Sequence, residues 1–499
     1  MQANVNSLTC YQILKEGDKK MGLMTVEEYK QSLRDDRVVY LRGKRVKDVT
    51  SNPMLKVGVD LAAVDYEMAE MPEYRDLAVV AHPKTGEPIS RYYYTPKNAD
   101  DLLKRHELMV TATRLAGGVI PLTHDVGADA MNAVEMTART IGKEEYIERA
   151  VSYREYLAKY DLSLAGAVTD VKGNRRLRPS SPKQAHPDFY VRVVDKDDKG
   201  IIVRGAKVHI TAAAYFNEML ILPTRAMTEE DADYALAFAI PANARGVTHI
   251  VHPMRAQRSA DEFPVDLPVR SHTDSLLIFD DVFVPWERVF LCGEWQFAMP
   301  LAHNFATLHR HTAASYRIPM TELIVGMAQA MAEYNGIERV PHVVQHITDL
   351  MIYLHMLKSL ARASCIDYVV HGGIPIPNPI ISNMAKYHFA SNYHDCVKMV
   401  QDIAGGLLIT APSYKDYQNP ETKDYIEKYL GGAAEFPTED RLRMLQLIRN
   451  TLSFELEVVA VHAEGSLQAQ RMTIYGEAIA EVQEYKKIAQ RAAGIRTAQ

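Results

Sequence analysis

The sequence predicts a mostly α-helical protein with a β domain in its middle. Apolar residues recur at three- and four-residue spacing before about residue 160 and again beyond about residue 297, as in amphipathic helices. Between about 165 and 290, short apolar or β-branched runs are bounded by Gly, Asp and Pro, as strands are. We therefore predict an N-terminal helical domain over 1–160, a β domain over 161–290 and a C-terminal helical bundle over 291–499.

Individual elements follow from the same patterns. Helical spacing marks five stretches, namely 100–119, 144–162, 321–336, 342–363 and 441–459. Strand-like runs occupy three stretches, namely 199–211, 234–246 and 274–284. No internal repeat or low-complexity linker separates these regions, so we expect layers of one body.

Composition restricts the class of protein. The chain has 499 residues, of which 47% are hydrophobic and 24% charged, an ordinary balance for a globular protein. A formal net charge of −6 argues against a nucleic-acid-binding surface, which is normally basic. Because no apolar run approaches the roughly 18 residues of a membrane span and the first 20 residues lack a signal-like stretch, we expect a cytoplasmic protein with no membrane association.

The cysteines give no sign of a disulfide scaffold or a zinc ribbon. Four are present and no two form a C-x-x-C pair: Cys10, Cys292, Cys365 and Cys396. Isolated cysteines of this kind usually serve as small buried hydrophobes, which is the role we expect here.

Common nucleotide-binding and hydrolase motifs are missing from the sequence. We find no G-x-G-x-x-G, no Walker A sequence and no G-x-S-x-G. Gly405 and Gly406, in the stretch AGGL, either cap the end of a helix or let the backbone approach a ligand closely.

Two polar stretches in the β region are candidate ligand contacts. The basic loop TDVKGNRRLRPSS at 169–181 carries Lys172 and three arginines, which either neutralise phosphates or form a solvated surface. On the strand 199–211, His209 and Thr211 share one face, either as an exposed rim or as the wall of a pocket.

The stretch LHRHTAASYR at 308–317 contains two histidines. His309 and His311 are two residues apart, so on a helix they point in nearly opposite directions. A helical metal pair needs four-residue spacing, as in H-E-x-x-H, so this stretch is a poor metal site. One ligand or one catalytic base remains possible, and His309 shares a face with Thr312.

Several stretches together resemble the 4-hydroxyphenylacetate 3-monooxygenase and 4-hydroxybutyryl-CoA dehydratase superfamily. They include MTVEEYKQSLRDDRVVYLRGKRVKDVTSNP, IIVRGAKVHIT, LLIFDDVFVPWERVFLCGE and QDIAGGLLITAPS. The resemblance implies an acyl-CoA dehydrogenase-like fold, with an N-terminal helical domain, a β-barrel-like middle domain and a C-terminal four-helix bundle. It also implies a homotetramer that binds FAD at subunit contacts.

The resemblance assigns cofactor roles to particular residues. Thr211 matches a threonine near the flavin N5 edge, and Gly405 and Gly406 match the contact with the adenosine diphosphate portion of FAD. Arg310 is expected at a flavin phosphate, and Lys172 of the basic loop is a further candidate cofactor contact.

Within the superfamily, GAVTDVKGNRRLRPS and GSLQAQRM look more like the dehydratase branch. That branch holds an iron–sulfur cluster through a C-x-x-x-C pair and an H-x-x-x-x-x-x-C pair. The matching positions here are Pro121 and Asp125, then His309 and Tyr316, so all three thiolates that such a cluster requires are missing. We therefore expect no metal site.

The residues by which the monooxygenase branch binds its phenol are also replaced. An arginine and a tyrosine of that branch fall on Val126 and Ala130, and its histidine falls on Gly166.

Three functions remain open on this basis. The first is a cluster-free FAD enzyme that acts on an acyl-CoA or similar activated acid by isomerisation, dehydration or dehydrogenation, with His309 as general acid or base. The alternative is the oxygenase component of a two-component FADH₂-dependent aromatic monooxygenase, supplied by a flavin reductase, in which Asp125, His124 or His309 contacts the substrate. The third is a non-catalytic relative.

Overall fold

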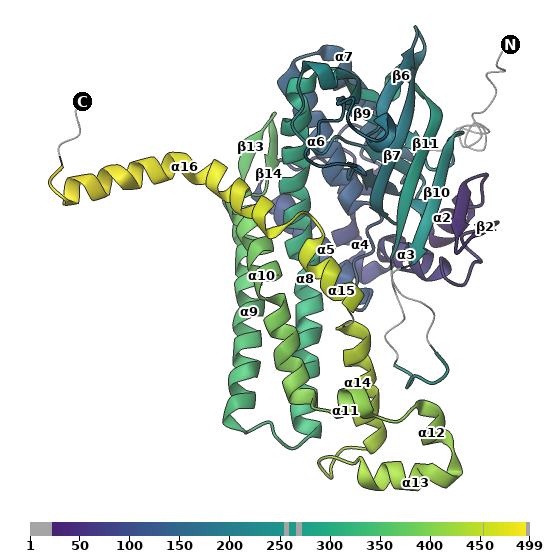
Figure 1. Cartoon of the computed structure of the whole chain (residues 1–499), viewed down its shortest axis with the longest axis vertical. Coiled ribbons are helices and arrows are strands. Elements are labelled where there is room, and N and C mark those ends of the chain that lie inside the picture. Colours follow the sequence, from purple (N-terminus) through teal and green to yellow (C-terminus); the bar gives the residue numbers. More distant parts are fainter. Residues whose placement is uncertain (1–21, 254–258, 266–271, 453, 496–499) are drawn as a thin grey trace.

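Two sheets from the middle of the chain lie beside a tall column of helices (Figure 1). The computed structural model describes residues 22–253, 259–265, 272–452 and 454–495. Cys10 and the first 20 residues, on which we based the expectation of a missing signal, lie outside these ranges.

The helices of the N-terminal third are α2 (Val26–Ser32), α3 (Lys56–Glu70), α4 (Pro72–Ala78), α5 (Ala99–Leu115), α6 (Asp125–Ile141) and α7 (Glu144–Tyr160). Those that follow the sheets are α8 (Ala298–Tyr334), α9 (Pro341–Ile366), α10 (Pro379–Ala404), α11 (Leu407–Thr410), α12 (Tyr414–Gln418), α13 (Pro420–Tyr429), α14 (Thr438–Thr451), α15 (Phe454–His462) and α16 (Leu467–Ala492). In the part of the chain that the structure describes, every helix is too short or too polar to cross a membrane.

The larger sheet has six strands in the order β2-β1-β10-β11-β7-β6. Their bounds are β1 (Val38–Leu41), β2 (Lys44–Val46), β6 (Arg192–Lys196), β7 (Gly200–Thr211), β10 (Val247–Pro253) and β11 (Thr273–Pro285). The smaller sheet has the order β12-β9-β8-β5, with β5 (Leu164–Ala167), β8 (Glu218–Ile221), β9 (Leu236–Pro241) and β12 (Val289–Cys292). Two short hairpins complete the strands, β3 (Val79–Ala81) with β4 (Pro88–Ser90) and β13 (Val369–His371) with β14 (Ile374–Ile376).

The expectation of a barrel-like middle domain is wrong. Closing a barrel requires the two edge strands of one sheet to pair with each other. Among the described residues, the larger sheet ends at β2 and β6 and the smaller one at β12 and β5, so both sheets stay open. The apolar faces of both sheets are buried in a core that they share with the helices. Because helices cover these faces, the sheets need not close into a barrel.

The three predicted strands are confirmed as β7, β9 and β11. Alternating burial along β7 shows why the sequence signal was clear, because one face of this strand lies in the core. The segment expected to be entirely helical also contributes strands, since β1 pairs in parallel with β10 and carries β2 with it.

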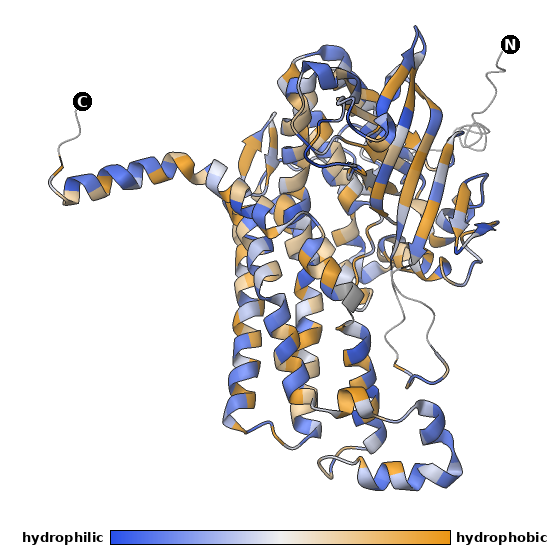
Figure 2. Ribbon diagram, in the orientation of Figure 1, coloured by the Kyte–Doolittle hydropathy of each residue, from blue (hydrophilic) through white to orange (hydrophobic). Residues whose placement is uncertain are grey.

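The C-terminal bundle is built from α8, α9 and α10, with α14 and α15 as a broken fourth column (Figure 1). The single amphipathic stretch predicted at 441–459 is therefore two helices that end and restart near Leu452. Helix α16 then leaves the body, and apolar residues remain uncovered along it (Figure 2), among them Met472, Tyr475, Val482, Tyr485 and Ile488.

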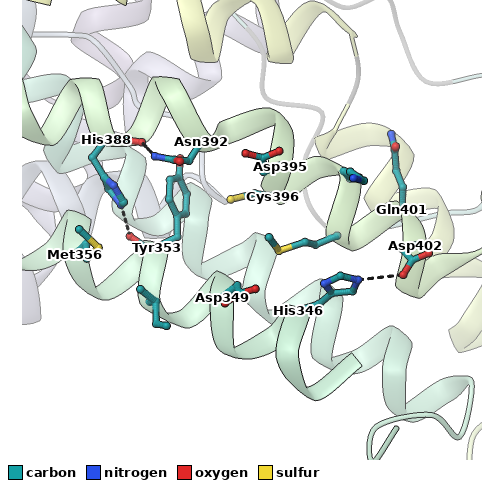
Figure 3. A pocket seen from close by; sticks show the side chains of 13 residues that line it. His346, Asp349, Tyr353, Met356, His388, Asn392, Asp395, Cys396, Gln401 and Asp402 are labelled. Atoms are coloured by element: carbon teal, nitrogen blue, oxygen red, sulfur yellow. Dashed lines mark hydrogen bonds and ion pairs between the residues drawn. The ribbon is translucent and has the colours of Figure 1, made fainter. Parts of the chain in front are cut away.

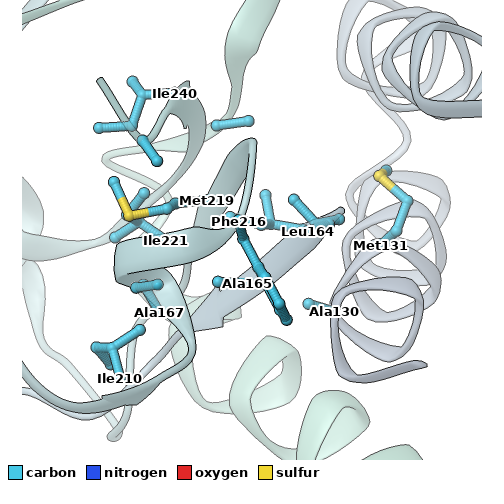
Figure 4. Close-up of a cluster of buried hydrophobic side chains, with 14 of the residues drawn as sticks. Ala130, Met131, Leu164, Ala165, Ala167, Ile210, Phe216, Met219, Ile221 and Ile240 are labelled. Atoms are coloured by element: carbon cyan, nitrogen blue, oxygen red, sulfur yellow. The ribbon is translucent and has the colours of Figure 1, made fainter. Parts of the chain in front are cut away.

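Helix α6 packs closely on strand β5, and this contact positions the site described below. In Figure 4, Ala130 and Met131 face Leu164, Ala165 and Phe216 across the core. A Cβ atom on Gly127 would lie 2.3 Å from the Leu164 carbonyl oxygen, so only glycine allows this approach.

Candidate active site

His309 lies on α8, where this helix passes between α6 and α10. Its side chain is half-buried and stacks on Phe305 with ring centroids 5.1 Å apart. The Nδ1 atom is buried and has no hydrogen-bond partner among the described residues. Burial lowers the pKa of His309, opposed by Glu464 and Asp129, so the neutral imidazole is favoured near pH 7.

Glu464 is an acidic neighbour of His309 and lies in the turn between α15 and α16. Its backbone is left-handed, with φ of 61°, a conformation that a residue with a side chain rarely adopts. The buried carboxylate accepts hydrogen bonds from Tyr316 and from Arg317, whose Nη2 is 2.8 Å away. Although burial opposes ionisation, the cations Arg317 and Lys386 lower the pKa of Glu464 to about 2, so it is ionised.

Lys386 of α10 is a second cation at the same carboxylate. Its Nζ atom lies 3.4 Å from Oε2 of Glu464 and donates to the Ala460 carbonyl at 3.1 Å, with none of its side chain exposed. Burial, assisted by repulsion from Arg317, lowers the pKa of Lys386 to about 7.

Asp129 of α6 is a second acidic neighbour of His309. Its carboxylate is 2.7 Å from Arg105 and accepts a hydrogen bond of 2.6 Å from Thr312. Burial raises the pKa of Asp129 despite Arg105. Thr312 therefore shares a face with His309, as the helical spacing predicted.

Asp125 begins the same helix one turn earlier. Burial and two neighbouring carboxylates raise the pKa of Asp125 well above its ordinary range. The arrangement thus provides a neutral imidazole with an ionised glutamate, Glu464, and a second acidic side chain, Asp129, in its surroundings, which suits the transfer of a proton.

Arg310 ties the C-terminal segment to the bundle. Its guanidinium donates to the Glu464 carbonyl at 3.1 Å, to Asn383 at 2.7 Å and to Thr473 at 3.0 Å. Burial lowers the pKa of Arg310 to about 10. Its expected contact with a flavin phosphate stays a prediction.

The other predicted cofactor residues are spread over the molecule. Thr211 ends β7, is half-buried and donates to Asp274 at 2.7 Å. Lys172 lies in the loop that follows β5. Gly405 caps the C-terminal end of α10, with φ of 70°, and the positions of a Cβ atom on Gly405 or Gly406 face open space.

The glycine pair does not belong to the surroundings of His309 in the same chain. Ile403, beside it, accepts a hydrogen bond from Asn335 just beyond the far end of α8. The 26 residues from His309 to Asn335 correspond to about 39 Å of helix. The glycine pair and His309 therefore lie at opposite ends of the bundle in one chain.

The residues at the expected cluster positions do not fit an iron–sulfur cluster. Pro121 has no side-chain ligand atom, Asp125 offers a carboxyl group where the cluster needs a thiolate, and the Tyr316 hydroxyl is bonded to Glu464. Across the described ranges, no three His, Cys, Asp or Glu side chains are grouped so as to hold a metal ion.

Sequence reasoning missed Glu464, Lys386, Arg317 and Asp129. Two signals were available: Asp125 and Asp129 lie four apart on one helix face, and Lys386 interrupts the apolar side of its helix. Neither signal indicates which side chains Asp129 and Lys386 contact in the folded protein.

A groove runs over the outer face of α9 and α10, away from these residues (Figure 3). His346 pairs with Asp402 across it at 3.1 Å, and Tyr353, Met356 and Cys396 form part of its floor. None of the predicted site residues lines it.

With this fold and site in place, sequence comparison identifies the class of protein. The N-terminal family model of 4-hydroxyphenylacetate 3-hydroxylase matches residues 25–291, and the C-terminal model matches residues 298–494. The chain therefore belongs to the 4-hydroxyphenylacetate 3-hydroxylase family, which confirms the predicted superfamily.

Particular relatives lie in two enzyme groups. The chain is 31% identical to the 4-hydroxybutyryl-CoA dehydratase/vinylacetyl-CoA-Δ-isomerase of Clostridium aminobutyricum, over 95% of this chain and 100% of that one. It is 29% identical to the oxygenase component of 4-hydroxyphenylacetate 3-monooxygenase of Thermus thermophilus, over 82% of this chain and 84% of that one.

Solved structures divide in the same way. An oxygen-tolerant archaeal 4-hydroxybutyryl-CoA dehydratase from N. maritimus aligns with a TM-score of 0.88 at 30% identity, covering 96% of each chain. The oxygenase component of a 4-hydroxyphenylacetate 3-monooxygenase complexed with FAD aligns with a TM-score of 0.84 at 25% identity, covering 94% of this chain and 99% of that one.

Proposed function

We propose that this protein is an FAD-dependent enzyme that acts on an acyl-CoA or a similar activated acid without an iron–sulfur cluster. The observation that carries the proposal is the half-buried His309, whose Nδ1 atom has no partner in the described chain and whose neighbours are Glu464 and Asp129. The similarity to the dehydratase/isomerase over nearly the whole chain supports this substrate class.

His309 acts as the proton carrier in this proposal. Burial keeps it neutral, the form that accepts a proton from the carbon next to a thioester carbonyl. The imidazolium that forms is stabilised by the ionised Glu464, and it returns the proton two carbons further along. The double bond of a 3-enoyl thioester moves into conjugation, with no net oxidation.

Glu464 is held in place by the groups around it rather than by its own backbone preference. Tyr316, Arg317 and Lys386 fix its carboxylate while its backbone stays in a left-handed conformation. Such retained strain is common at functional sites, where the surroundings enforce one geometry.

The residues present are compatible with FAD. The half-buried hydroxyl of Thr211, the cationic loop at Lys172 and the open space at Gly405 and Gly406 are suitable contacts. Since Gly405 lies far from His309, we propose that the glycine pair serves the flavin of a second copy in a homotetramer. Bound flavin would supply a redox partner for the substrate.

The test uses purified protein with FAD and vinylacetyl-CoA, followed by chromatography of the thioester products. We expect bound oxidised flavin, recognised by its visible spectrum, and conversion to the conjugated isomer. Dehydration of 4-hydroxybutyryl-CoA and dehydrogenation of butyryl-CoA are assayed in parallel. No turnover of any acyl-CoA would contradict the proposal.

The alternative is the oxygenase component of a two-component aromatic monooxygenase, supplied with reduced flavin by a flavin reductase. It is supported by the similarity to oxygenases over most of the chain. The expected phenol-binding positions are apolar here, because Val126 packs against Gly166 and Ala130 is buried. Oxygen consumption with a phenol, FAD, NADH and a reductase would favour this alternative.

A further inference from the structure

Lys386 of α10 is buried, and its positive charge is only weakly matched. None of its side chain is exposed, and the ring of Phe389 lies 5.8 Å from its Nζ atom. An ammonium group has three N–H donors. Here the group donates to the Ala460 carbonyl at 3.1 Å, and Oε2 of Glu464 is 3.4 Å away. The charged form of Lys386 therefore loses more solvation on burial than these contacts return.

The carboxylate of Glu464 is shared between two cations. Nη2 of Arg317 lies 2.8 Å from the same oxygen, Oε2, and Oε1 accepts a hydrogen bond from Tyr316. A third cation, Arg310, donates to the backbone carbonyl of Glu464 at 3.1 Å. Because a guanidinium keeps its proton, Lys386 is the cation of this group that can become neutral.

The elements that pack against α10 carry further titratable groups. They include Tyr316 on α8, Tyr353, Lys358, Arg362 and Cys365 on α9, Glu457 and His462 on α15, and Arg471 on α16. The charges that act on Lys386 most strongly are nonetheless Arg317, Glu464 and Arg310. One carboxylate therefore stands against two lasting positive charges, which favours the neutral form of the lysine.

His309 depends on the same carboxylate. Glu464 raises the pKa of His309, whereas Arg317 and Arg310 lower it. A proton on Lys386 partly cancels the negative charge that would stabilise the imidazolium. When Lys386 is neutral, more of that negative charge acts on His309, so the histidine is a stronger base.

We propose that Lys386 is a positioning residue that sets the basicity of His309 through Glu464, and that the active form holds it as a neutral amine. This inference rests on the proposed function, in which His309 carries the proton. Lys386 acts from behind the carboxylate, because its side chain is fully covered. Burial and Arg317 lower the pKa of Lys386 to about 7, so both of its forms are populated near neutral pH.

The first test measures the rate at which the FAD-loaded protein isomerises saturating vinylacetyl-CoA at pH 6.5 and 8.5. A group with a pKa of about 7 is about one quarter neutral at pH 6.5 and almost fully neutral at pH 8.5, so the wild-type rate should rise about 4-fold. Lys386→Met is always neutral, and its rate should rise by less than about 2-fold.

Lys386→Arg keeps the charge at every pH, so its rate at pH 8.5 should stay about 5-fold below that of the wild type. Lys398→Met, at an exposed lysine of the same helix, is the matched control and should keep the wild-type profile. A role in packing alone would not separate the methionine and arginine variants in this way. Far-ultraviolet circular dichroism checks the fold, and if the bulkier arginine variant does not fold, the methionine variant decides.

The second test needs no turnover. Diethyl pyrocarbonate modifies neutral imidazole, so mass spectrometry of the peptide that contains His309 follows its protonation as the pH is varied. Below pH 7 the wild type carries a cation that Lys386→Met lacks, so the pKa of His309 should be higher by about half a pH unit in this variant. Lys386→Arg and Lys398→Met should leave it unchanged.

The two tests separate the possible failures. The same pKa of His309 in the wild type and in Lys386→Met would overturn the inference, and so would a rate profile of Lys386→Met that matches the wild type. If the pKa shifts as expected while none of the proteins converts an acyl-CoA, Lys386 still controls His309 and the proposed function fails.

Discussion

His309 and His311 lie two residues apart on α8, yet their surroundings differ in almost every respect. The ring of His311 is buried and its partners are neutral groups: Nδ1 pairs with Ser364 at 3.0 Å and Nε2 is 3.5 Å from Cys365. His309 is half-buried, with one nitrogen unpaired, and it is flanked by charged side chains.

The difference lies in what each helix face meets. The His311 face packs against α9 and α5, where His106 pairs with Ser315 at 2.7 Å and the network is closed. Burial raises the pKa of the Cys365 thiol to about 12, so this cysteine is inert and the cluster is structural. Satisfied neutral groups stabilise a fold, whereas an unpaired imidazole beside an ionised carboxylate is available for chemistry.

The largest expected effect is on turnover. Replacing His309 by Gln removes the proton carrier, so the rate of acyl-CoA isomerisation should fall by about 10²- to 10⁴-fold, with little change in stability. His311→Gln should instead leave the rate per folded molecule within about 2-fold and lower the free energy of unfolding by about 1–3 kcal/mol. Single-turnover assays and urea unfolding measure both. An equal loss of rate in the two variants would contradict the assignment of a catalytic role to His309 and a structural role to His311.

Next in size is the loss of the buried carboxylate. Glu464→Gln leaves Arg317 and Lys386 without their counter-charge, so the free energy of unfolding should fall by about 3–5 kcal/mol. Adding Lys386→Met should restore part of this loss, which a double-mutant cycle in urea detects. Glu477→Gln, at a partly exposed pair with His303, serves as control and should change stability by less than about 1 kcal/mol.

The buried histidines near His311 predict that the stability of the protein falls in acid. Burial lowers the pKa of His106 to about 4, so between pH 6.5 and 4 the unfolded chain binds a proton that the folded protein does not. Stability contributed by this residue is lost as the pH falls through that window, by about 1.4 kcal/mol per pH unit.

His106→Gln should therefore flatten the decline in stability between pH 6.5 and 5, measured by urea unfolding at several pH values. The exposed His342→Gln is the control and should leave the slope unchanged. An unchanged slope in His106→Gln would mean that this histidine binds its proton equally in the folded and unfolded states.

The smallest effect is expected for Ser364→Ala. It removes one buried hydrogen bond to His311 and should lower the free energy of unfolding by about 1 kcal/mol without changing turnover. Ser391→Ala, at an exposed serine of α10, should have less effect. Loss of turnover in Ser364→Ala would show that the two faces are coupled.

Much of the fold could be predicted because periodicity is local. The strands at 199–211 and 274–284 carry the alternation that a half-buried sheet requires, and the long helices carry theirs. The break near Leu452 and the parallel pairing of β1 with β10 were missed, since both depend on contacts with distant segments. The open sheets were missed because the sequence of one strand does not show whether the two edge strands of its sheet pair with each other.

The site was predicted only in part. His309 was selected through the resemblance to the dehydratase branch, and helical spacing predicted that it and His311 point in different directions, which the separate partners of the two rings confirm. Glu464 follows Tyr316 by 148 residues and lies in a turn, so no pattern connected the two. The roles of Thr211, Lys172, Arg310, Gly405 and Gly406 toward a cofactor stay predictions.

The sequence by itself therefore determined the layers of helix and strand, the family, and which face of α8 carries His309. Spacing along the chain fixes these properties, because side-chain direction follows from helix and strand geometry. Only the tertiary structure decided that Glu464, Lys386 and Asp129 surround this histidine and that Gly405 lies at the other end of the bundle. Burial and charge pairing arise from segments far apart in sequence, and these set the protonation of each group.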